Sequence, residues 1–264
     1  MLRSGKRRNF KLDWSRGLPA IFCLLIFMGC QQKTNQVPDI ESRLNPNRSR
    51  DYVVLLHGMW RSSHAMDPLE NYLEDKDYQV INLSYPSTEF PIETLVERYL
   101  HPAVALLQTG PLQKIHFVSH SMGGILVRYY LKHYDVPALG RVVMLSPPNQ
   151  GTPLADLARG TDWYHDITGP SGKQLGTEEQ SLVKTLGPVD FELGVIAGTG
   201  SNWTTSWLIP GLDDGVVSVE NTKVQGMQDF IAVAEKHYRL RREAQVLQQV
   251  AFFLENGRFL HRSA

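Results

Sequence analysis

The chain has 264 residues, of which 42% are hydrophobic, and it carries 27 basic and 27 acidic side chains. This length and apolar content are sufficient for one sizeable α/β domain or two small ones. The formal net charge is zero and no long basic stripe crosses the body of the chain, which argues against nucleic acid as a partner.

Residues 1–29 have the pattern of a secretory signal peptide. A basic head precedes LPAIFCLLIFMG (18–29), an apolar run that is too short to span a bilayer as a helix. The sequence FMGC (27–30) resembles a bacterial lipobox, although Phe27 stands where leucine is usual. This resemblance implies cleavage before Cys30, lipidation of Cys30 and a place in the bacterial cell envelope, on the periplasmic side of the outer membrane. An uncleaved anchor and a plain secretion signal stay open as alternatives.

Cleavage before Cys30 changes both the cysteine content and the charge. The other cysteine, Cys23, lies in the removed segment, so the mature chain forms no internal disulfide, and its formal charge is −5. Residues 30–50 would then be a lipidated cysteine and a flexible tether, because the segment is polar, contains two prolines and has no apolar period. The folded domain is expected at residues 51–264.

From residue 51 onward, short apolar segments typical of strands alternate with segments of helical periodicity. The predicted strands are 52–58, 79–87, 114–119, 141–148, 193–201 and 229–237. The predicted helices are 62–76, 91–110, 125–134 and 242–257, and the second is interrupted or kinked at Pro102. This alternation predicts an α/β fold with a mostly parallel sheet and helices on both faces.

Two segments interrupt this alternation. Residues 149–192 are rich in Gly, Thr and Asp, with one helix expected near 178–186, and residues 199–213 form an expected loop with two tryptophans. Long irregular loops in compact domains are often functional. Each segment is therefore a candidate cover over a site.

The sequence SHSMG (119–123) stands where a predicted strand meets a predicted helix. A residue at the tip of such a sharp turn has strained backbone angles, and its neighbours two places away must be small. Ser121 has Ser119 before it and Gly123 after it, whereas the usual G-x-S-x-G pattern has glycine at both places. The pattern predicts an exposed nucleophilic Ser121, and an ordinary turn with a capping hydroxyl is the alternative.

The sequence HGMW (57–60) follows the first predicted strand. Parallel strands bring their carboxyl ends to one edge of a sheet, where sites form. An acyl-transfer site needs two backbone N–H donors for the oxyanion, and we expect these to be Met59 and Met122. His57 is expected to hydrogen-bond nearby loops rather than to act as a base.

The segments YVVLLHGMW, HFVSHSMGG and SPPNQGTPLAD resemble the α/β-hydrolase superfamily, specifically bacterial lipase-like and GPI-inositol-deacylase-like members. The resemblance covers most of residues 51–257. It implies a triad in the order Ser, Asp or Glu, His, with Ser121 as the nucleophile. Of the four histidines after Ser121, His237 stands where the family has its base; the others are His133, His165 and His261.

The segment LDDGVVSVENT (212–222) is similar to the family's N-D-G-x-V segment. Matching the aspartate-glycine pair implies that Asp214 is the triad acid, with Asp213 as the competitor. A surface turn or a calcium site is the alternative for the same residues. No clear second carboxylate pair is visible, so we expect neither a metal nor a cofactor.

The resemblance implies a serine hydrolase, a lipase or carboxylesterase, that acts on acyl-ester or lipid substrates. An apolar acyl pocket is expected from Met59, Trp60, Trp203, Trp207 and Leu208. A thioesterase, an amidase or an acyltransferase with the same triad stays open, as does a catalytically silent binding lipoprotein. The sequence gives no prediction of the oligomeric state.

Overall fold

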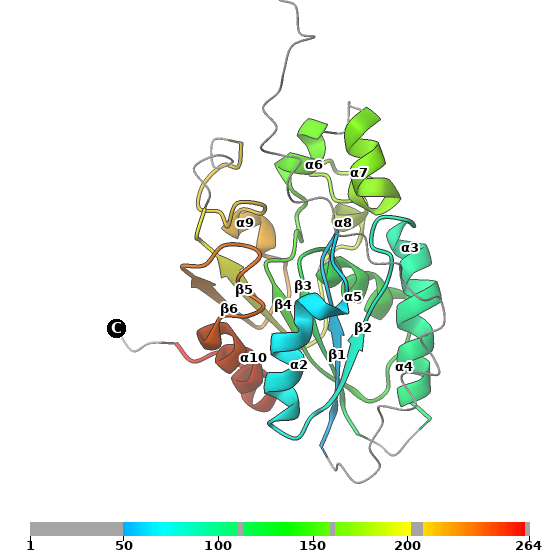
Figure 1. The fold of residues 1–264 in the computed structure, drawn as a ribbon, viewed down its shortest axis with the longest axis vertical. Coiled ribbons are helices and arrows are strands. Elements are labelled where there is room, and N and C mark those ends of the chain that lie inside the picture. The colour runs from blue at the N-terminus through cyan, green and yellow to red at the C-terminus, as the bar shows by residue number, and fades with distance from the viewer. Residues whose placement is uncertain (1–49, 110–112, 159–161, 202–207, 262–264) are drawn as a thin grey trace, which may run out of the picture. The chain divides into compact units, whose positions relative to one another are not determined.

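The computed structural model describes residues 50–109, 113–158, 162–201 and 208–261 (Figure 1). The chain separates into two compact units, Met1–Gln31 and Gln32–Ala264. All described residues belong to the second unit. The predicted signal peptide, Cys30 and nearly all of the tether therefore lie outside the described residues.

Six strands form one sheet in the order β2-β1-β3-β4-β5-β6, and every neighbouring pair is parallel. The strands are β1 (Tyr52–Leu56), β2 (Gln79–Leu83), β3 (Ile115–His120), β4 (Leu139–Leu145), β5 (Leu193–Gly198) and β6 (Asp229–Val233). Every residue of β1 and β3 is buried, as expected of strands that are covered on both faces. The predicted α/β fold with a parallel sheet is confirmed.

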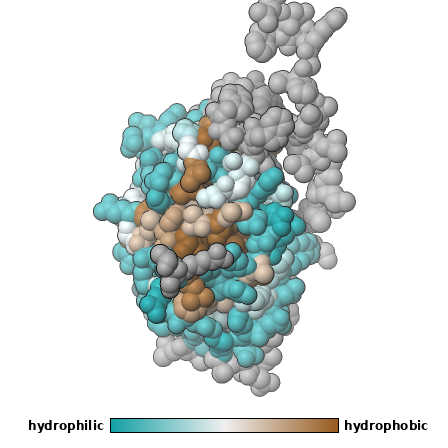
Figure 2. Space-filling view, turned by 90° about the vertical axis from the view of Figure 1, so that its left-hand side faces the viewer, coloured by the Kyte–Doolittle hydropathy of each residue, from teal (hydrophilic) through white to brown (hydrophobic). Residues whose placement is uncertain are grey.

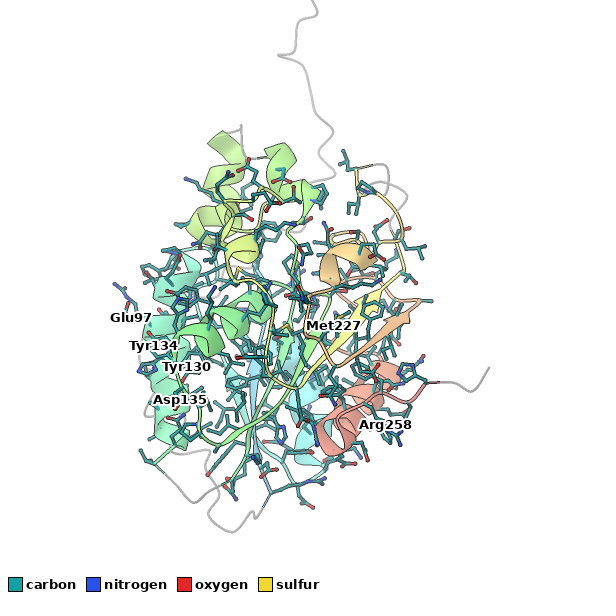
Figure 3. All side chains as sticks on the ribbon, turned by 180° about the vertical axis from the view of Figure 1, so that it is seen from behind. Glu97, Tyr130, Tyr134, Asp135, Met227 and Arg258 are labelled. Carbon is teal, nitrogen blue, oxygen red and sulfur yellow. The ribbon has the colours of Figure 1, made fainter. Side chains whose placement is uncertain are left out.

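Helices cover both faces of this sheet. They are α2 (Asp67–Glu74), α3 (Ile92–Leu95), α4 (His101–Leu107), α5 (Met122–His133), α6 (Pro153–Ala158), α7 (Asp162–Lys173), α8 (Leu182–Thr185), α9 (Val219–Thr222) and α10 (Ala244–Asn256). In Figure 1, α2 and α10 lie on the near face, and the view from behind in Figure 3 shows α4 and α5 on the other. Beyond the carboxyl ends of the strands, at the top of Figure 1, lie α6 and α7.

The core consists of two apolar layers, one on each face of the sheet. Alternate residues of β1 divide between them, because successive side chains of a strand point to opposite faces. Tyr52, Val54 and Leu56 pack with the α3, α4 and α5 side, whereas Val53 and Leu55 pack with α2 and α10. The sheet is thus a rigid platform whose carboxyl edge carries the loops with the predicted site residues.

Aromatic rings fix α5 against α4. The rings of Tyr130 and Tyr134 (Figure 3) stack with their centroids 5.0 Å apart. Tyr134 also stacks on His101 of α4 at 4.3 Å. These contacts lie at the C-terminal end of α5, whereas Ser121 directly precedes its first residue, Met122.

The edge strand β6 lies on the side of the molecule shown in Figure 2. Apolar residues gather in the middle of this side, and hydrophilic residues surround them (Figure 2). Phe230 and Ile231 of β6 are partly buried and Ala232 is exposed. Among the described strands, only β5 pairs with β6, which is therefore an edge strand of the sheet.

The predicted helix 91–110 is interrupted as expected. A π-helical turn, Val96–Leu100, separates α3 from α4. Pro102 has no N–H to donate to the Arg98 carbonyl, so the regular α-helical bonding fails at this point. The predicted end at Gly110 lies outside the described residues.

Residues 149–192 contain more helix than the sequence predicted. The helix expected near 178–186 is the short α8, and two helices that were not predicted, α6 and α7, precede it. Outside this segment, α9 was also not predicted. Gly169, with a φ of 63°, and Pro170 interrupt α7, and they hide its helical pattern in the sequence.

Several predicted strands extend three or four residues beyond the strands in the structure. For example, β6 was predicted to reach residue 237 but ends at Val233, so that His237 lies in a turn after it.

Candidate active site

Ser121 lies at the sharp turn between β3 and α5. Its backbone angles are φ 57° and ψ −128°, a combination that an L-residue rarely adopts. The Ser121 N–H donates to the Leu145 carbonyl at 2.9 Å, which ties the turn to the end of β4. The neighbouring strand therefore supports the strained conformation.

The residues two places either side of Ser121 are under unequal constraint. A Cβ at Gly123 would lie 2.7 Å from the Leu56 carbonyl oxygen and 2.8 Å from that of His57, so that glycine is required there. Ser119 is fully buried, and its hydroxyl has no partner among the described residues. The turn therefore accepts serine at this position, where the usual motif has glycine.

Asp214 and His237 form a hydrogen-bonded pair. Nδ1 of His237 donates to Oδ2 of Asp214 at 2.6 Å, and the His237 N–H donates to the Asp214 carbonyl at 3.0 Å. The other carboxylate oxygen of Asp214 accepts from the N–H groups of Val216 and Val217, at 3.0 and 2.9 Å. A histidine ring whose single hydrogen is on Nδ1, donated to Asp214, has Nε2 available to accept a proton.

Asp213, the competing acid, has different partners. Its Oδ1 accepts from the Gly215 N–H at 2.7 Å, and its backbone forms a bridge with Ser218. Burial raises the pKa of Asp213, and the charge of Asp214 adds to this, although the hydrogen bond from Gly215 opposes it. Asp214 is the carboxylate that contacts His237.

Ser146, at the end of β4, is a neighbour of this pair that the sequence analysis missed. It is fully buried, has a φ of 43°, and accepts the Gly198 N–H at its hydroxyl oxygen at 3.0 Å. Its own hydrogen then binds the Asp214 carboxylate. Burial alone raises the pKa of Asp214, but the charge and hydrogen bond of His237, with those from Ser146 and Val217, lower that pKa below its usual value. In the sequence, the only signal for this contact is that Ser146 directly follows a buried strand, at the carboxyl edge of the sheet.

Ser121 and His237 lie on segments that touch each other. His120, which precedes Ser121, has its Nε2 2.9 Å from the carbonyl oxygen of His237. No hydrogen bond joins the Ser121 hydroxyl to the His237 ring within the described part of the chain. Catalytic hydrogen bonds are often long before substrate binds.

The other later histidines lie elsewhere. His133 is exposed on α5 with Nδ1 at the Tyr129 carbonyl, and His261 is exposed and paired with Asp229. The side chain of His165 lies outside the described residues.

His57 fixes the loop that follows β1, as the sequence analysis predicted. Its Nδ1 donates to the Gly58 carbonyl at 2.8 Å, its Nε2 accepts the Tyr85 N–H at 3.3 Å, and the His57 and Tyr85 rings stack at 4.0 Å. Burial lowers the pKa of His57 to about 4, so the ring is neutral at pH 7. In a trans peptide the C=O and the N–H point in opposite directions. The bond to the Gly58 carbonyl therefore directs the Met59 N–H away from His57.

Trp60 continues this loop at the surface. It is 57% exposed, has a φ of 56°, and donates its indole N–H to the Ile167 carbonyl of α7 at 2.7 Å. Trp203 and Trp207, which were expected to line the same pocket, lie outside the described residues.

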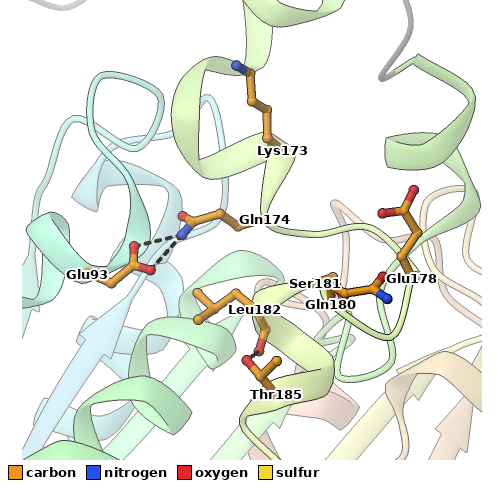
Figure 4. Close-up of a pocket in the computed structure, with 8 residues that line it drawn as sticks. All are labelled: Glu93, Lys173, Gln174, Glu178, Gln180, Ser181, Leu182 and Thr185. Carbon is orange, nitrogen blue, oxygen red and sulfur yellow. Dashed lines mark hydrogen bonds between the residues drawn. The ribbon is translucent and has the colours of Figure 1, made fainter.

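A hollow of about 340 Å³ lies between α3, α7 and α8 (Figure 4). Its lining is mostly polar: Glu93, Lys173, Gln174, Glu178, Gln180, Ser181, Leu182 and Thr185. The Gln174 amide donates to both oxygens of Glu93 at 2.9 and 2.7 Å, which ties α7 to α3. None of the predicted site residues lines this hollow.

The described residues contain no group of three or more His, Cys, Asp or Glu side chains arranged to hold a metal ion. In the same part of the chain, no helix has the length and apolar character needed to cross a membrane.

The sequence pattern of the alpha/beta hydrolase family matches residues 53–248. The chain belongs to the α/β hydrolase family. Ser121, Asp214 and His237 all lie within the matched residues.

Several known proteins resemble this α/β hydrolase. Palmitoyl-protein thioesterase 3 of Dictyostelium discoideum is 22% identical over 125 residues, which are 44% of this chain and 42% of that protein. Lipase BlEst2 of Bacillus licheniformis, in its mature form, has a TM-score of 0.62 at 18% identity, over 81% of this chain and 94% of that one. In its propeptide form the TM-score is 0.66 at 18% identity, over 83% of this chain and 53% of that one.

Phospholipase PlaB of Legionella pneumophila has a TM-score of 0.58 at 18% identity, over 72% of this α/β hydrolase and 53% of that chain. This chain thus spans about half or less of the thioesterase, of PlaB and of BlEst2 in its propeptide form. At these identities the structural likeness concerns the fold.

Proposed function

We propose that the protein is a serine hydrolase that cleaves carboxylic esters, with acyl or lipid esters as substrates. The observation that carries this proposal is the 2.6 Å hydrogen bond between His237 and Asp214, at the same sheet edge as the strained turn of Ser121. A neutral histidine oriented by a buried carboxylate is the base that activates a serine hydroxyl.

The reaction proceeds in two steps. Nε2 of His237 takes the proton of Ser121 while Oγ attacks the ester carbonyl carbon, and the carbonyl electron pair moves onto the oxygen. The oxyanion collapses, the C–O bond to the alcohol breaks, and the leaving alcohol takes the proton from His237. Water then attacks the acyl-enzyme, gives a proton to His237 and releases the acid, and Ser121 regains its hydrogen. Asp214 orients the ring and stabilises the imidazolium throughout.

Met59 and Met122 are the proposed oxyanion donors. Met122 is the first residue of α5, so its N–H belongs to the end of the helix that has no partners within the helix. The Met59 N–H points away from His57 because the Gly58 carbonyl is bound to the His57 ring. Two backbone donors of this kind typically supply a large part of the rate enhancement.

The apolar character of the substrate is proposed from the exposed Trp60 beside Met59 and from the names of the similar proteins, which include a lipase and a phospholipase. A series of p-nitrophenyl esters with acyl chains of 2 to about 16 carbons tests this. We expect hydrolysis to be lost in Ser121→Ala and kcat/KM to be highest for a medium or long chain. Hydrolysis of no ester in the series, by a folded protein, would contradict the proposal.

A thioesterase is the second candidate, because the matched curated relative is named a palmitoyl-protein thioesterase. The same triad cleaves thioesters, whose leaving group is a thiol. Comparing kcat/KM for an ester and a thioester with the same acyl chain distinguishes the two functions: preference for the thioester by more than about tenfold would favour the second.

The anchor is a separate proposal. Residues 1–29 act as a lipoprotein signal peptide, and lipidated Cys30 attaches the enzyme to the periplasmic side of the bacterial outer membrane. Processing in a bacterial host would then be blocked by globomycin and lost in Cys30→Ala. Normal processing of Cys30→Ala would contradict this proposal without affecting the proposed reaction.

A further inference from the structure

We infer that His120 is a positioning residue, whose side chain ties the main chain of His237 to the turn that carries Ser121. The inference rests on the proposed function, because it assigns His237 the role of base. His120 is the last residue of β3 and directly precedes Ser121.

The contact itself is specific. Nε2 of His120 lies 2.9 Å from the carbonyl oxygen of His237, and the two ring centroids are 4.6 Å apart at 51°. A carbonyl oxygen only accepts hydrogen bonds, so Nε2 of His120 carries the hydrogen. The His120 side chain is buried, which shields this bond from competition by water.

His237 depends on this bond because it lies in a turn and not in a strand or helix. The N–H of His237 is held by the Asp214 carbonyl, and the C=O of His237 is held by His120. The base is therefore fixed on one side to the segment of the acid and on the other to the segment of the nucleophile. The distance between the His237 ring and Ser121 is set through His120.

The remaining features of His120 agree with this role. With the hydrogen on Nε2, the buried Nδ1 has no hydrogen-bond partner among the described residues. A buried polar atom without a partner is destabilising and is rare in folded proteins. A Cβ at Gly58 would lie 3.1 Å from this Nδ1 and 3.0 Å from the Ser121 Cβ, so that the His57–Trp60 loop packs directly against both residues.

The neutral state of His120 also suits the reaction. Burial, then the charges of His237 and Arg241, hold the pKa of His120 well below its usual value. A protonated His120 would repel the imidazolium that forms on His237 during each step. A neutral donor supports the base without opposing its charge.

Two substitutions of His120 by side chains of similar size separate the effect of the hydrogen bond on catalysis from the effect of side-chain packing. The His120→Gln side chain retains an N–H that can donate to the His237 carbonyl, whereas the His120→Met side chain has none. We measure kcat and KM on a p-nitrophenyl ester with the full chain, and thermal unfolding to confirm that both variants fold. We expect His120→Met to lower kcat about 10- to 100-fold with KM within about twofold, and His120→Gln to recover most of the loss.

His116 provides the matched control. It is a second buried histidine of β3, four residues earlier, and its ring binds Asp51 and the Arg141 N–H rather than His237. Substitution of His116 by Gln or Met is expected to change stability but to leave kcat of the folded protein unchanged.

Equal kcat values for the Gln and Met variants of His120, at whatever level, would overturn the inference, since the hydrogen bond would then make no difference. A wild-type protein that hydrolyses no ester is a different failure: it contradicts the proposed function and removes the reaction that His120 would serve.

Discussion

Ser121 combines an unfavourable backbone conformation with a hydroxyl that has no hydrogen-bond partner in the described part of the chain. Strain of this kind is retained where it serves function, because less strained alternatives would be more stable. At φ 57° and ψ −128° the clash involves the Cβ, and glycine, which has none, adopts such angles readily.

We therefore predict that Ser121→Gly is inactive but more stable than the wild type. Relief of strain exceeds the extra flexibility of glycine in the unfolded chain, for a net gain of about 1 kcal/mol. Urea unfolding measures this, with Ser121→Ala as the control that removes the hydroxyl and keeps the strain. Equal stability of the two variants would contradict a strained turn.

The two neighbouring aspartates are predicted to differ sharply in their effect on catalysis. Asp214→Asn removes the charge that orients His237, and kcat should fall by about 10³- to 10⁴-fold. Asp213→Asn keeps an oxygen for the Gly215 N–H and should lower kcat by less than about tenfold. Steady-state kinetics of both variants decides this, and a larger loss for Asp213→Asn would reassign the acid.

At the scale of elements, the crossing of α5 over the end of β1 determines how the turn can be built. Gly123 lies where the helix passes the carbonyl oxygens of Leu56 and His57, at a distance that leaves no room for a Cβ. Ser119, on the strand side of the turn, has space for its side chain, but its buried hydroxyl has no partner among the described residues.

Gly123→Ala is accordingly expected to destabilise the fold by about 2–3 kcal/mol and to lower kcat, because the start of α5 must move away from β1. Ser119→Ala should change stability by less than about 1 kcal/mol and retain activity, since it removes a hydroxyl that makes no hydrogen bond to any described residue. Thermal unfolding and ester hydrolysis of both variants test the contrast. A well-tolerated Gly123→Ala would show that the crossing is looser than described.

The sequence predicted the six strands and their parallel arrangement because continuous apolar runs such as YVVLL are hard to interpret otherwise. It predicted the strand ends poorly: β6 ends at Val233, but no glycine or proline marks the turn in the residues up to His237, so the sequence does not show where the strand stops. Helix α7 was missed because Gly169 and Pro170 break the period on which the prediction depends, and α6 has only 6 residues, too few to show a helical period.

Part of the site could be proposed from sequence and part could not. Ser121 was proposed from the spacing in SHSMG (119–123), because a sharp turn requires small residues two places before and after its tip. The choice of Asp214 and His237 depended on a resemblance to a family, because the pairing joins residues 23 positions apart. Ser146 and His120 carry no local signal: their contacts with Asp214 and His237 exist only once the strands are side by side.

At the scale of the whole molecule, the buried histidines make stability depend on pH. Burial lowers the pKa of His57 to about 4, and it also lowers the pKa values of His116 and His120. In the unfolded chain these groups take up protons near pH 6.5, so between about pH 6.5 and 4 the unfolded state binds more protons than the folded state. Stability is therefore complete above pH 6.5 and decreases as the pH falls.

For His57 alone, the free energy of unfolding should be about 2 kcal/mol lower at pH 5 than at pH 7.5. When the pH falls below the ordinary pKa of an aspartate, protonation of Asp214 lowers the free energy of unfolding further, because the pKa of Asp214 is lower in the folded state than in the unfolded chain. Urea unfolding at the two pH values with unchanged m-values measures the difference. A stability that is equal or higher at pH 5 would contradict the neutral, buried state of these rings.

The most direct test of the whole account is covalent labelling with a fluorophosphonate, followed by intact and peptide mass spectrometry. The reagent reacts with a serine hydroxyl only where a base and oxyanion donors activate it. We predict one adduct on the wild-type protein, located at Ser121, with no labelling of Ser121→Ala and much slower labelling of Asp214→Asn. A folded wild-type protein that stays unlabelled, or an adduct at another serine, would contradict the proposed triad.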